Sequence, residues 1–355
     1  MKIFYYLSSY ISHLTAGLEY LECLRALGHD TRGNIAEGAD APASLRMLSE
    51  NDDLCHFARQ ADTVILHDDP LNFENIFAAL PFLEKKRCIA FVPWENELLS
   101  PLFIPFLQRV NEVWTCSEFS LAAIAPHVHR CALLPHLVRR AGKADLPWYR
   151  AWLSERGAQD DFIFLSVLDA VNPRKNLRGL LTAFSMLHRH TRKPVRLLVK
   201  QYRVDLDVGS VAGVLNLPET LPAERMAALY AGCGAYVSAH HAEGWGLGLS
   251  SAMAYGKPVI ATAYSGNMQF MNERNSILIP YVTAPVSEEM IARIPLFTAD
   301  MRWAEPDMDA LVEAMRRAAE GRLPPDLPAH AVEITRTYGP KRIRARLQEL
   351  LNKRM

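Results

Sequence analysis

Short apolar runs alternate with amphipathic helical patterns along almost the whole chain, and this alternation constrains the fold more than any other feature. The runs have the length of buried strands, and most are followed by apolar residues at helical spacing. Strands that alternate with helices predict parallel sheets with both faces covered. The predicted strands form a first series, 2–8, 63–69, 87–93, 111–117 and 132–136, and a second series, 161–169, 195–201, 234–239, 258–263 and 276–281.

The alternation is interrupted by the charged stretch at residues 139–161. We therefore predict two doubly wound, Rossmann-like α/β domains, an N-terminal one over residues 1–140 and a C-terminal one over 141–330. Ligands of open α/β sheets bind beyond the carboxyl ends of the strands, so we expect the binding site in a cleft between the domains. The predicted helices cover residues 15–30, 176–190, 223–233, 308–321 and 341–353.

Composition excludes several classes of protein. The 355 residues are 50% hydrophobic and 22% charged, which is ordinary for a folded globular protein. Lysine plus arginine equals aspartate plus glutamate at 39 each, so the net charge provides no attraction to nucleic acid. The six cysteines show no metal-ligand spacing, which predicts buried thiols in a reducing compartment. The N-terminal apolar run is too short for a signal peptide or a membrane span, and we expect a cytoplasmic protein.

The most informative segment is AEGWGLGLSSAMAYGKPVIATAYSGN, residues 242–267. Its pattern is loop, helix and strand, with Gly246 or Leu247 opening the helix after Glu243. A helix N-terminus presents unpaired N–H groups and a partial positive charge, which suits an anion. The YSGN loop at 264–267 follows the next strand at the same sheet edge and adds further N–H donors. From these residues alone, an anion site and a tightly packed glycine-rich turn are both open.

Within this segment, EGWGLGLSSAMAYGKPVIAT resembles the signature of retaining glycosyltransferases of family 4, which have the GT-B fold. Residues 93–120 and VNPRKNLRGLLTAF at 171–184 are similar to the same family. With YSGNMQFM, they resemble a bacterial subgroup that builds surface polysaccharides with rhamnose or mannose. The resemblance spans residues 93 to about 281. It implies two Rossmann-like domains facing a cleft, and a final helical segment, 331–355, that packs back toward the N-terminal domain.

The resemblance also implies a reaction, the metal-independent transfer of a sugar to an acceptor hydroxyl with retained anomeric configuration. The donor would be a dTDP-, GDP- or UDP-sugar, and the acceptor a saccharide or lipid-linked saccharide in bacterial polysaccharide synthesis. No cofactor, metal or nucleic-acid partner is expected. The sequence places no second acid as a covalent nucleophile. The resemblance therefore suggests front-face displacement, in which the leaving diphosphate helps to take the acceptor proton.

Three residues have the implied catalytic roles. Glu243 matches the family's first motif acid, which binds donor-sugar hydroxyls and stabilises the charged transition state. Lys175, in the PRKN segment, would reach the diphosphate as a point charge. His67, at the end of a first-domain strand, would face the cleft near the donor sugar. From the sequence alone each residue has a structural alternative: a solvated loop acid, an exposed lysine at a helix start and a core histidine.

The chain departs from the family pattern at two positions. Ser251 stands where the family has a second acid that takes both ribose hydroxyls, and a serine cannot accept two hydroxyl donors as a carboxylate does. A deoxyribose donor, a replacement contact and reduced activity all remain open. Ala170 stands where many members have an arginine five residues before the lysine. Arg174 would replace that arginine, or the diphosphate would be held less firmly.

The remaining predicted site residues have supporting roles. Asp68 and Asp69 are expected to form a turn before Pro70 and not a metal site. Either His240 or His241 would face the sugar. Gly17 would let the N-terminus of the first helix approach the diphosphate. The other predicted donor-binding residues are Lys200, Gly244, Trp245, Gly246, Leu247, Ser265, Gly266 and Asn267, and the predicted acceptor-side residues are Trp94 and Glu95.

The sequence alone leaves two alternative functions and the role of one surface segment undecided. A nucleotide-sugar epimerase of the same fold would need no acceptor. A catalytically weak glycosyltransferase-like binding subunit would fit Ser251 and Ala170. Residues 129–143 combine apolar side chains with basic ones, and either a peripheral membrane surface or a solvated linker fits them.

Overall fold

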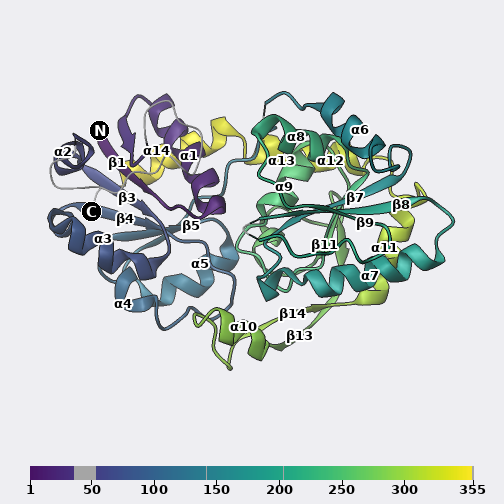
Figure 1. Ribbon diagram of the computed structural model, residues 1–355. Helices are drawn as coiled ribbons and strands as arrows, with labels where there is room; N and C mark the ends of the chain where they lie inside the picture. The colour runs from purple at the N-terminus through teal and green to yellow at the C-terminus, as the bar shows by residue number, and fades with distance from the viewer. Residues whose placement is uncertain (36–52, 141, 203, 354–355) are drawn as a thin grey trace. The chain divides into compact units, whose positions relative to one another are not determined.

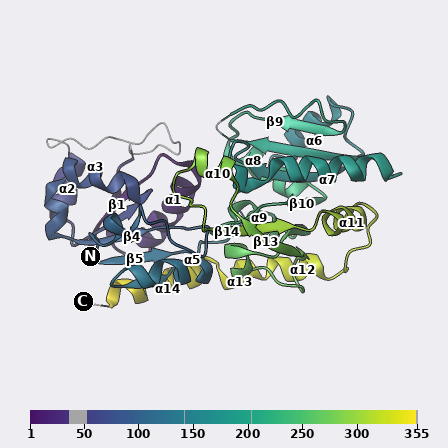
Figure 2. The same cartoon turned by 90° about the horizontal axis from the view of Figure 1, so that it is seen from below.

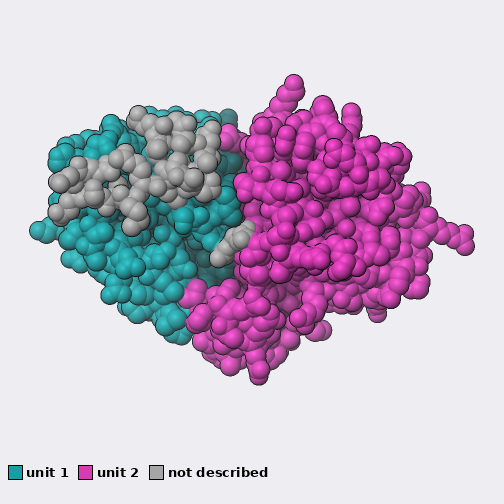
Figure 3. Space-filling model, in the orientation of Figure 1, with its two compact units in different colours: residues 1–137, 338–355 teal, residues 138–337 magenta. Residues whose placement is uncertain are grey.

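The computed structural model describes residues 1–35, 53–140, 142–202 and 204–353, and the chain forms two compact units (Figure 3). Unit 1 comprises residues 1–137 and 338–355, and unit 2 comprises residues 138–337. Both chain termini therefore belong to unit 1 (Figure 2). Unit 2 extends to residue 337 and not to the predicted boundary at 330, because two short helices follow the one that was expected to end the domain.

Unit 1 is built on a parallel sheet of six strands in the order β2-β1-β3-β4-β5-β6 (Figure 1). The chain builds outward from β1 to one edge and then from β3 to the other, so the direction of winding reverses between β1 and β3. This reversal makes the sheet doubly wound, as the sequence predicts. The strands are β1 (Lys2–Leu7), β2 (Asp30–Gly33), β3 (Thr63–His67), β4 (Arg87–Phe91), β5 (Glu112–Thr115) and β6 (Cys131–Leu133).

Helices cover both faces of this sheet (Figure 1). The last helix packs against the first, and Arg346 Nε donates a hydrogen bond to the Leu133 carbonyl at 2.9 Å, which ties the C-terminal helix to β6 of unit 1. The α-helices are α1 (Ile11–Ala26), α2 (Asp53–Gln60), α3 (Phe73–Ala79), α4 (Ile104–Leu107), α5 (Glu118–Ile124) and α14 (Pro340–Asn352). The 3₁₀ turns are η2 (Pro70–Asn72), η3 (Pro81–Lys85) and η4 (Ala125–His127).

Unit 2 repeats the plan with a second parallel sheet, in the order β12-β11-β10-β7-β8-β9. Here the winding reverses between β7 and β10. Phe164 and Phe184 are fully buried in the core between this sheet and its helices. The strands are β7 (Phe162–Leu168), β8 (Val195–Gln201), β9 (Val214–Leu217), β10 (Ala235–Ser238), β11 (Val259–Thr262) and β12 (Ile277–Ile279).

The helices of unit 2 also lie on both faces, with α7 and α11 on one face and α8 and α12 on the other (Figure 1). An antiparallel pair, β13 (Tyr281–Pro285) and β14 (Arg302–Pro306), forms a separate small sheet. Helix α10 (Glu288–Arg293) lies in the segment that connects these two strands (Figures 1 and 2). The other helices are α6 (Leu146–Ser154), α7 (Leu177–His190), α8 (Ala223–Gly232), α9 (Leu247–Ala254), α11 (Met308–Ala319), α12 (Leu327–Val332) and α13 (Ile334–Thr337), with 3₁₀ turns η5 (Pro173–Lys175) and η6 (Ser265–Gln269).

In the stretch at 129–143, of which residue 141 lies outside the described residues, the apolar side chains Leu134, Leu137 and Val138 are buried in the protein. A peripheral membrane contact of this stretch stays a prediction. Arg140 donates to the Ala254 carbonyl at 2.9 Å. Across the described residues, no helix combines the length and apolar character needed to cross a membrane.

Candidate functional site

The candidate site lies at the switch point of the unit 2 sheet. Two neighbouring parallel strands, β7 and β10, end there, and the chain leaves them in opposite directions. Such a reversal opens a crevice at the carboxyl ends of the strands, which is where open α/β sheets bind ligands. The loop after β7 contains Arg174 and Lys175, and the loop after β10 contains Glu243. Strand order thus brings Glu243 beside two adjacent residues that precede it by 68 and 69 positions in the chain.

The carboxylate of Glu243 is held by two cations from the turn η5. Lys175 Nζ lies 2.6 Å from Oε1, and the nearest guanidinium nitrogen of Arg174 lies 3.3 Å from Oε2. The Glu243 side chain is only 12% exposed, and that of Arg174 is 7% exposed, whereas Lys175 is 21% exposed. A carboxylate this buried is stable only when paired.

The pairing keeps Glu243 ionised. Burial alone would raise the pKa of the carboxyl group, but the positive charges of Lys175 and Arg174 outweigh it and lower the pKa from 4.5 to about 2. Glu243 therefore presents a negative charge at any physiological pH.

Turn η5 is fastened to the loop that carries Glu243 by hydrogen bonds on several atoms. Arg174 donates through its guanidinium to the Ala242 carbonyl at 2.6 Å, and its own carbonyl accepts from the His241 amide at 2.9 Å. Asn176 Nδ2 donates to the Ala239 carbonyl at 2.9 Å. Asn176 has a left-handed backbone with φ of 50°, a conformation that asparagine tolerates better than most residues. The PRKN segment thus sets the position of the glutamate loop.

The loop after β11 closes the other side of the site. The Glu243 amide donates to Ser265 Oγ at 2.7 Å, and the Gly266 amide donates to the Glu243 carbonyl at 2.8 Å. A methyl group at Gly266 would overlap the backbone of Gly244, so only glycine fits where these loops meet. The predicted donor-binding residues Ser265 and Gly266 therefore lie directly against the predicted catalytic loop.

His240 has a defined tautomer. Asn267 Nδ2 donates to the Thr262 carbonyl at 3.0 Å, which turns Oδ1 of the same amide toward His240 Nε2, 3.1 Å away. Nε2 must therefore carry the proton, and Nδ1 accepts from Ser238 Oγ at 3.0 Å. Burial lowers the pKa of His240 to about 4, so the ring is neutral at pH 7. His241 instead bonds the Ala304 carbonyl and stacks on Trp303 at 4.1 Å between ring centroids.

Helix α9 begins at Leu247, and Gly246 precedes it with φ of 92°, which confirms the predicted helix start. Trp245 is buried, packs on Phe270 and donates to Ser250 Oγ at 3.1 Å, so its indole is part of the packed interior of unit 2. The Ser251 side chain lies close enough to the Tyr230 hydroxyl to lower the pKa of that tyrosine, although burial outweighs this effect. The position at which the family has an acid is therefore occupied by a neutral hydroxyl next to Tyr230.

Lys200 lies on β8, one strand further from the switch point than β7. It is almost fully buried, its Nζ donates to the Gln201 carbonyl at 2.5 Å, and it lies over the Tyr202 ring at 4.3 Å. Burial lowers its pKa to about 8. The structure therefore places Lys200 near the sheet edge of the site but gives it no contact with the Glu243 cluster among the described residues.

In unit 1, His67 ends β3 as predicted, but its side chain is 0% exposed and does not face solvent. Nδ1 bonds the Tyr5 hydroxyl at 3.0 Å, and the rings of His13 and Phe91 contact it. Within the described part of the chain, Nε2 of His67 has no hydrogen-bond partner. Burial, followed by the neighbouring histidines, lowers the pKa of His67 well below 6.5. Its role at a donor sugar stays a prediction.

Two other expectations for unit 1 need correction. Gly17 does not lie at the helix N-terminus, because α1 begins six residues earlier. A side chain at Gly17 would meet Leu7 and His67, so this glycine lets α1 pack on β1 and β3. Trp94 is buried, and its indole donates to the Leu98 carbonyl at 2.9 Å, so the side chain does not line an open acceptor surface.

Glu95, the second predicted acceptor-side residue, is half-buried in the loop after β4. The HDDP segment forms the predicted turn, since Asp69 caps η2 by accepting from the Leu71 amide at 2.9 Å. Among the described residues, no group of three or more histidine, cysteine, aspartate or glutamate side chains is arranged to hold a metal ion.

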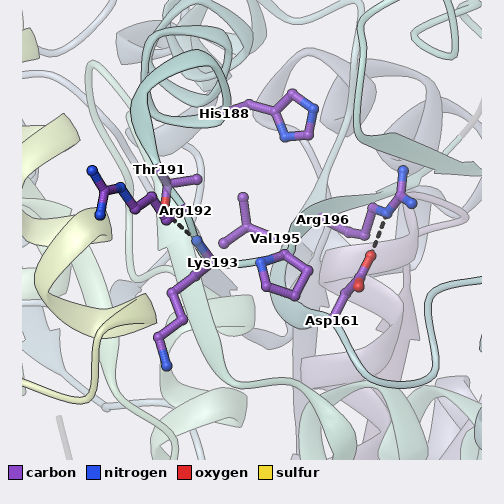
Figure 4. Close-up of a pocket in the computed structure, with 8 residues that line it drawn as sticks. Asp161, His188, Thr191, Arg192, Lys193, Val195 and Arg196 are labelled. Atoms are coloured by element: carbon purple, nitrogen blue, oxygen red, sulfur yellow. Dashed lines mark hydrogen bonds and ion pairs between the residues drawn. The ribbon is translucent and has the colours of Figure 1, made fainter.

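A pocket of about 320 Å³ lies at the opposite end of the unit 2 sheet (Figure 4). It is formed where α7 ends and β8 begins, and its walls include the paired side chains of Asp161 and Arg196, whose closest atoms are 2.6 Å apart. None of the predicted site residues lines it. This pocket faces the amino ends of the strands, so it is separate from the Glu243 cluster.

Comparison with known proteins agrees with this arrangement. Residues 159–294 match the family model described as Glycosyl transferases group 1. The matched region includes the whole Glu243 cluster. An O-antigen chain mannosyltransferase B from Escherichia coli is 27% identical over 146 residues, which span 39% of this chain and 37% of that relative. The alignment therefore covers little more than a third of either protein.

Solved structures resemble the whole chain. Anabaena Alr3699/HepE, in complex with UDP and glucose, matches with a TM-score of 0.64 and 15% identity over 100% of both chains. Sucrose-phosphate synthase from Thermosynechococcus elongatus matches with a TM-score of 0.64 and 15% identity over 99% of both. At this identity the likeness establishes the fold. The predicted GT-B class, with two doubly wound α/β sheets, is confirmed; the cleft between them stays a prediction.

The ionised state of Glu243 should appear in the pH dependence of stability. Its pKa is lower in the folded protein than its usual 4.5, so the folded state binds fewer protons than the unfolded state between about pH 4.5 and pH 2. The stabilisation is complete above this window and is lost as the pH falls through it. We expect Glu243→Gln to destabilise the protein at pH 6, and urea titrations should show this difference from wild type shrinking toward pH 3. A difference that does not change with pH would contradict the pairing.

Proposed function

We propose that this protein is a retaining glycosyltransferase that moves a sugar from a nucleotide-sugar donor to a saccharide or lipid-linked saccharide acceptor in bacterial polysaccharide synthesis. One observation carries the proposal: a buried, ionised Glu243 paired with Lys175 and Arg174 at the switch point of a doubly wound sheet. A diphosphate is bound by cations, and sugar hydroxyls are bound by a hydrogen-bond acceptor. In this cluster Lys175 and Arg174 are the cations, and the Glu243 carboxylate is the acceptor.

The comparisons support the proposal from two directions. The matched family is one of glycosyl transferases, and its region contains the cluster. The Escherichia coli relative is named an O-antigen chain mannosyltransferase, which supports a sugar polymer as the product. Anabaena Alr3699/HepE is described in complex with UDP and glucose, and a pneumococcal O-GlcNAc transferase of 12% identity, TM-score 0.56, with UDP and GlcNAc. The present chain covers 56% of that second protein.

In the proposed reaction, Lys175 binds the donor diphosphate and stabilises the charge that develops as the sugar leaves. Glu243 accepts hydrogen bonds from the sugar hydroxyls and its negative charge favours the positive character of the transition state. Amide groups at the start of α9 and in the 264–267 loop add donors for the anion. The acceptor hydroxyl attacks the face that the diphosphate leaves, and a diphosphate oxygen takes its proton. The chain contributes positioning and electrostatics.

Substitution of Glu243 tests the proposal. Glu243→Gln keeps the shape of the side chain but removes its charge, and loss of one such stabilising group typically lowers turnover by about two to three orders of magnitude. The assay combines UDP-, GDP-, ADP- and dTDP-sugars, first in a thermal-shift panel for binding and then in transfer assays with saccharide acceptors. A near-normal rate in Glu243→Gln would remove this residue from the mechanism.

The same assay separates the rival functions. An epimerase would release a free epimer from the donor without an acceptor. A binding subunit would bind donor without transfer or hydrolysis. The second of these has a specific observation in its favour, because Ser251 is a neutral residue and Ala170, which packs against the apolar core of unit 2, has no charge with which to bind a diphosphate.

We further propose that Ser251 selects the donor nucleotide. A carboxylate at this position would hold both hydroxyls of a ribose, whereas one serine oxygen suffices for the single hydroxyl of a deoxyribose. Wild type should therefore bind dTDP at least as tightly as UDP in calorimetry. Ser251→Glu should shift the preference toward UDP or GDP by about ten- to a hundredfold, since a hydrogen bond to a charged group contributes about 1.5–3 kcal/mol. Wild type that binds UDP or GDP tenfold more tightly than dTDP would refute this selection.

A further inference from the structure

The two cations beside Glu243 differ in how they are held. Arg174 is nearly buried, and its guanidinium spans the 2.6 Å bond to the Ala242 carbonyl and the 3.3 Å contact to the Glu243 carboxylate. Its main-chain carbonyl accepts from the His241 amide, and its main-chain amide donates to Asn172 Oδ1 at 3.1 Å. Arg174 is therefore bonded to the protein through both its backbone and its side chain.

Lys175 is also bonded through its backbone, since its main-chain amide donates to the Asn172 carbonyl at 3.0 Å, and the difference lies in its side chain. That side chain is about three times as exposed as that of Arg174, and its bond to Glu243 Oε1 is a charge pair on a flexible stem. An incoming diphosphate can compete for an ammonium on such a stem without disturbing the backbone. The Arg174 side chain is only 7% exposed, and its Nη1 bonds both the Ala242 carbonyl and the Glu243 carboxylate, so an incoming diphosphate would have to compete with the glutamate loop for this nitrogen.

We propose that Arg174 is a positioning residue that holds the 240–243 loop and the Glu243 carboxylate in place, and that Lys175 alone of the two contacts the donor diphosphate. The role of Lys175 at the diphosphate rests on the proposed function. The positioning role of Arg174 does not depend on it. This positioning role replaces the expectation from the sequence that Arg174 takes over the contact of the arginine absent at position 170. Donor binding would then exchange the Lys175–Glu243 pair for a Lys175–diphosphate pair, which leaves Oε1 for the sugar while Arg174 retains Oε2.

The environment of Glu243 supports this division. The groups that act on its carboxyl are Lys175 and Arg174 from η5 and His240 on its own loop, and the Glu243 charge in turn acts on Tyr236 of β10. His240 and Tyr236 are neutral at pH 7, since burial lowers the pKa of the first and raises that of the second. When Lys175 turns to the diphosphate, Arg174 is thus the group left to keep Glu243 ionised.

Matched neighbours provide the test. Arg174→Gln and Lys175→Gln each remove one positive charge, at neighbouring positions of the 355-residue chain. We expect Lys175→Gln to weaken the binding of UDP, GDP or dTDP, whichever wild type binds, by about ten- to a hundredfold. Arg174→Gln should change that affinity less than threefold while it lowers kcat at least tenfold. Equal losses of nucleoside diphosphate affinity in the two variants would overturn the proposal.

A second readout needs no ligand. Amide hydrogen exchange of residues 240–246 should be at least tenfold faster in Arg174→Gln than in wild type and nearly unchanged in Lys175→Gln, because the Arg174 guanidinium bonds the backbone carbonyl of Ala242, whereas the Lys175 ammonium bonds the Glu243 carboxylate. Arg174→Lys keeps the charge but loses the planar guanidinium. Exchange of residues 240–246 should also be faster in this variant than in wild type, by a smaller factor. This variant replaces Arg174→Gln in the test if Arg174→Gln does not fold. Equal exchange in both neighbours would refute positioning. Failure of wild type to bind any nucleoside diphosphate would refute the proposed function and leave this readout standing.

Discussion

The arrangement of the candidate site depends on one buried charge. A carboxylate that is 12% exposed is unfavourable unless it is paired, and Glu243 is paired with two cations that come from a turn about 70 residues earlier in the chain. Removing one partner of a buried pair typically costs about 3–5 kcal/mol, because the remaining charge is left uncompensated. The pairing thus links the loops after β7 and β10. If either loop moved away, a buried charge on the other loop would lose its partner.

Parallel strand order makes this pairing available. The winding reverses between β7 and β10, so the loops that follow them diverge and leave their polar backbone groups at one edge. The loop after β11 then closes the site through Ser265 and Gly266, and the bond from Asn267 fixes the tautomer of His240. Each loop is bonded to its neighbour by backbone groups and short polar side chains, which suits a preorganised electrostatic site more than one that folds around its ligand.

Much of this arrangement is readable from the sequence, and the rest depends on tertiary contacts. Periodicity located most strands of both sheets, and the family resemblance singled out Lys175 and Glu243, although their direct pairing appears only in the structure. Periodicity did not locate the antiparallel β13–β14 pair, which is short and of which β13 is largely exposed, nor α6, which lies inside a charged stretch. It also could not show that Trp94 is buried, because an aromatic side chain fits a core and a binding surface equally well. The direction of Arg174 follows from hydrogen bonds that no local pattern encodes.

The central claim is that a nucleotide sugar binds at the switch point of unit 2, against the Glu243 loop. Hydrogen exchange of wild type with and without a saturating nucleotide sugar from the UDP, GDP and dTDP series measures this directly. We expect slower exchange in residues 170–177, 240–247 and 264–268, with little change at the pocket around residues 188–196 at the other end of the sheet. Protection confined to that pocket, or unchanged exchange in all three loops under saturating donor, would contradict it.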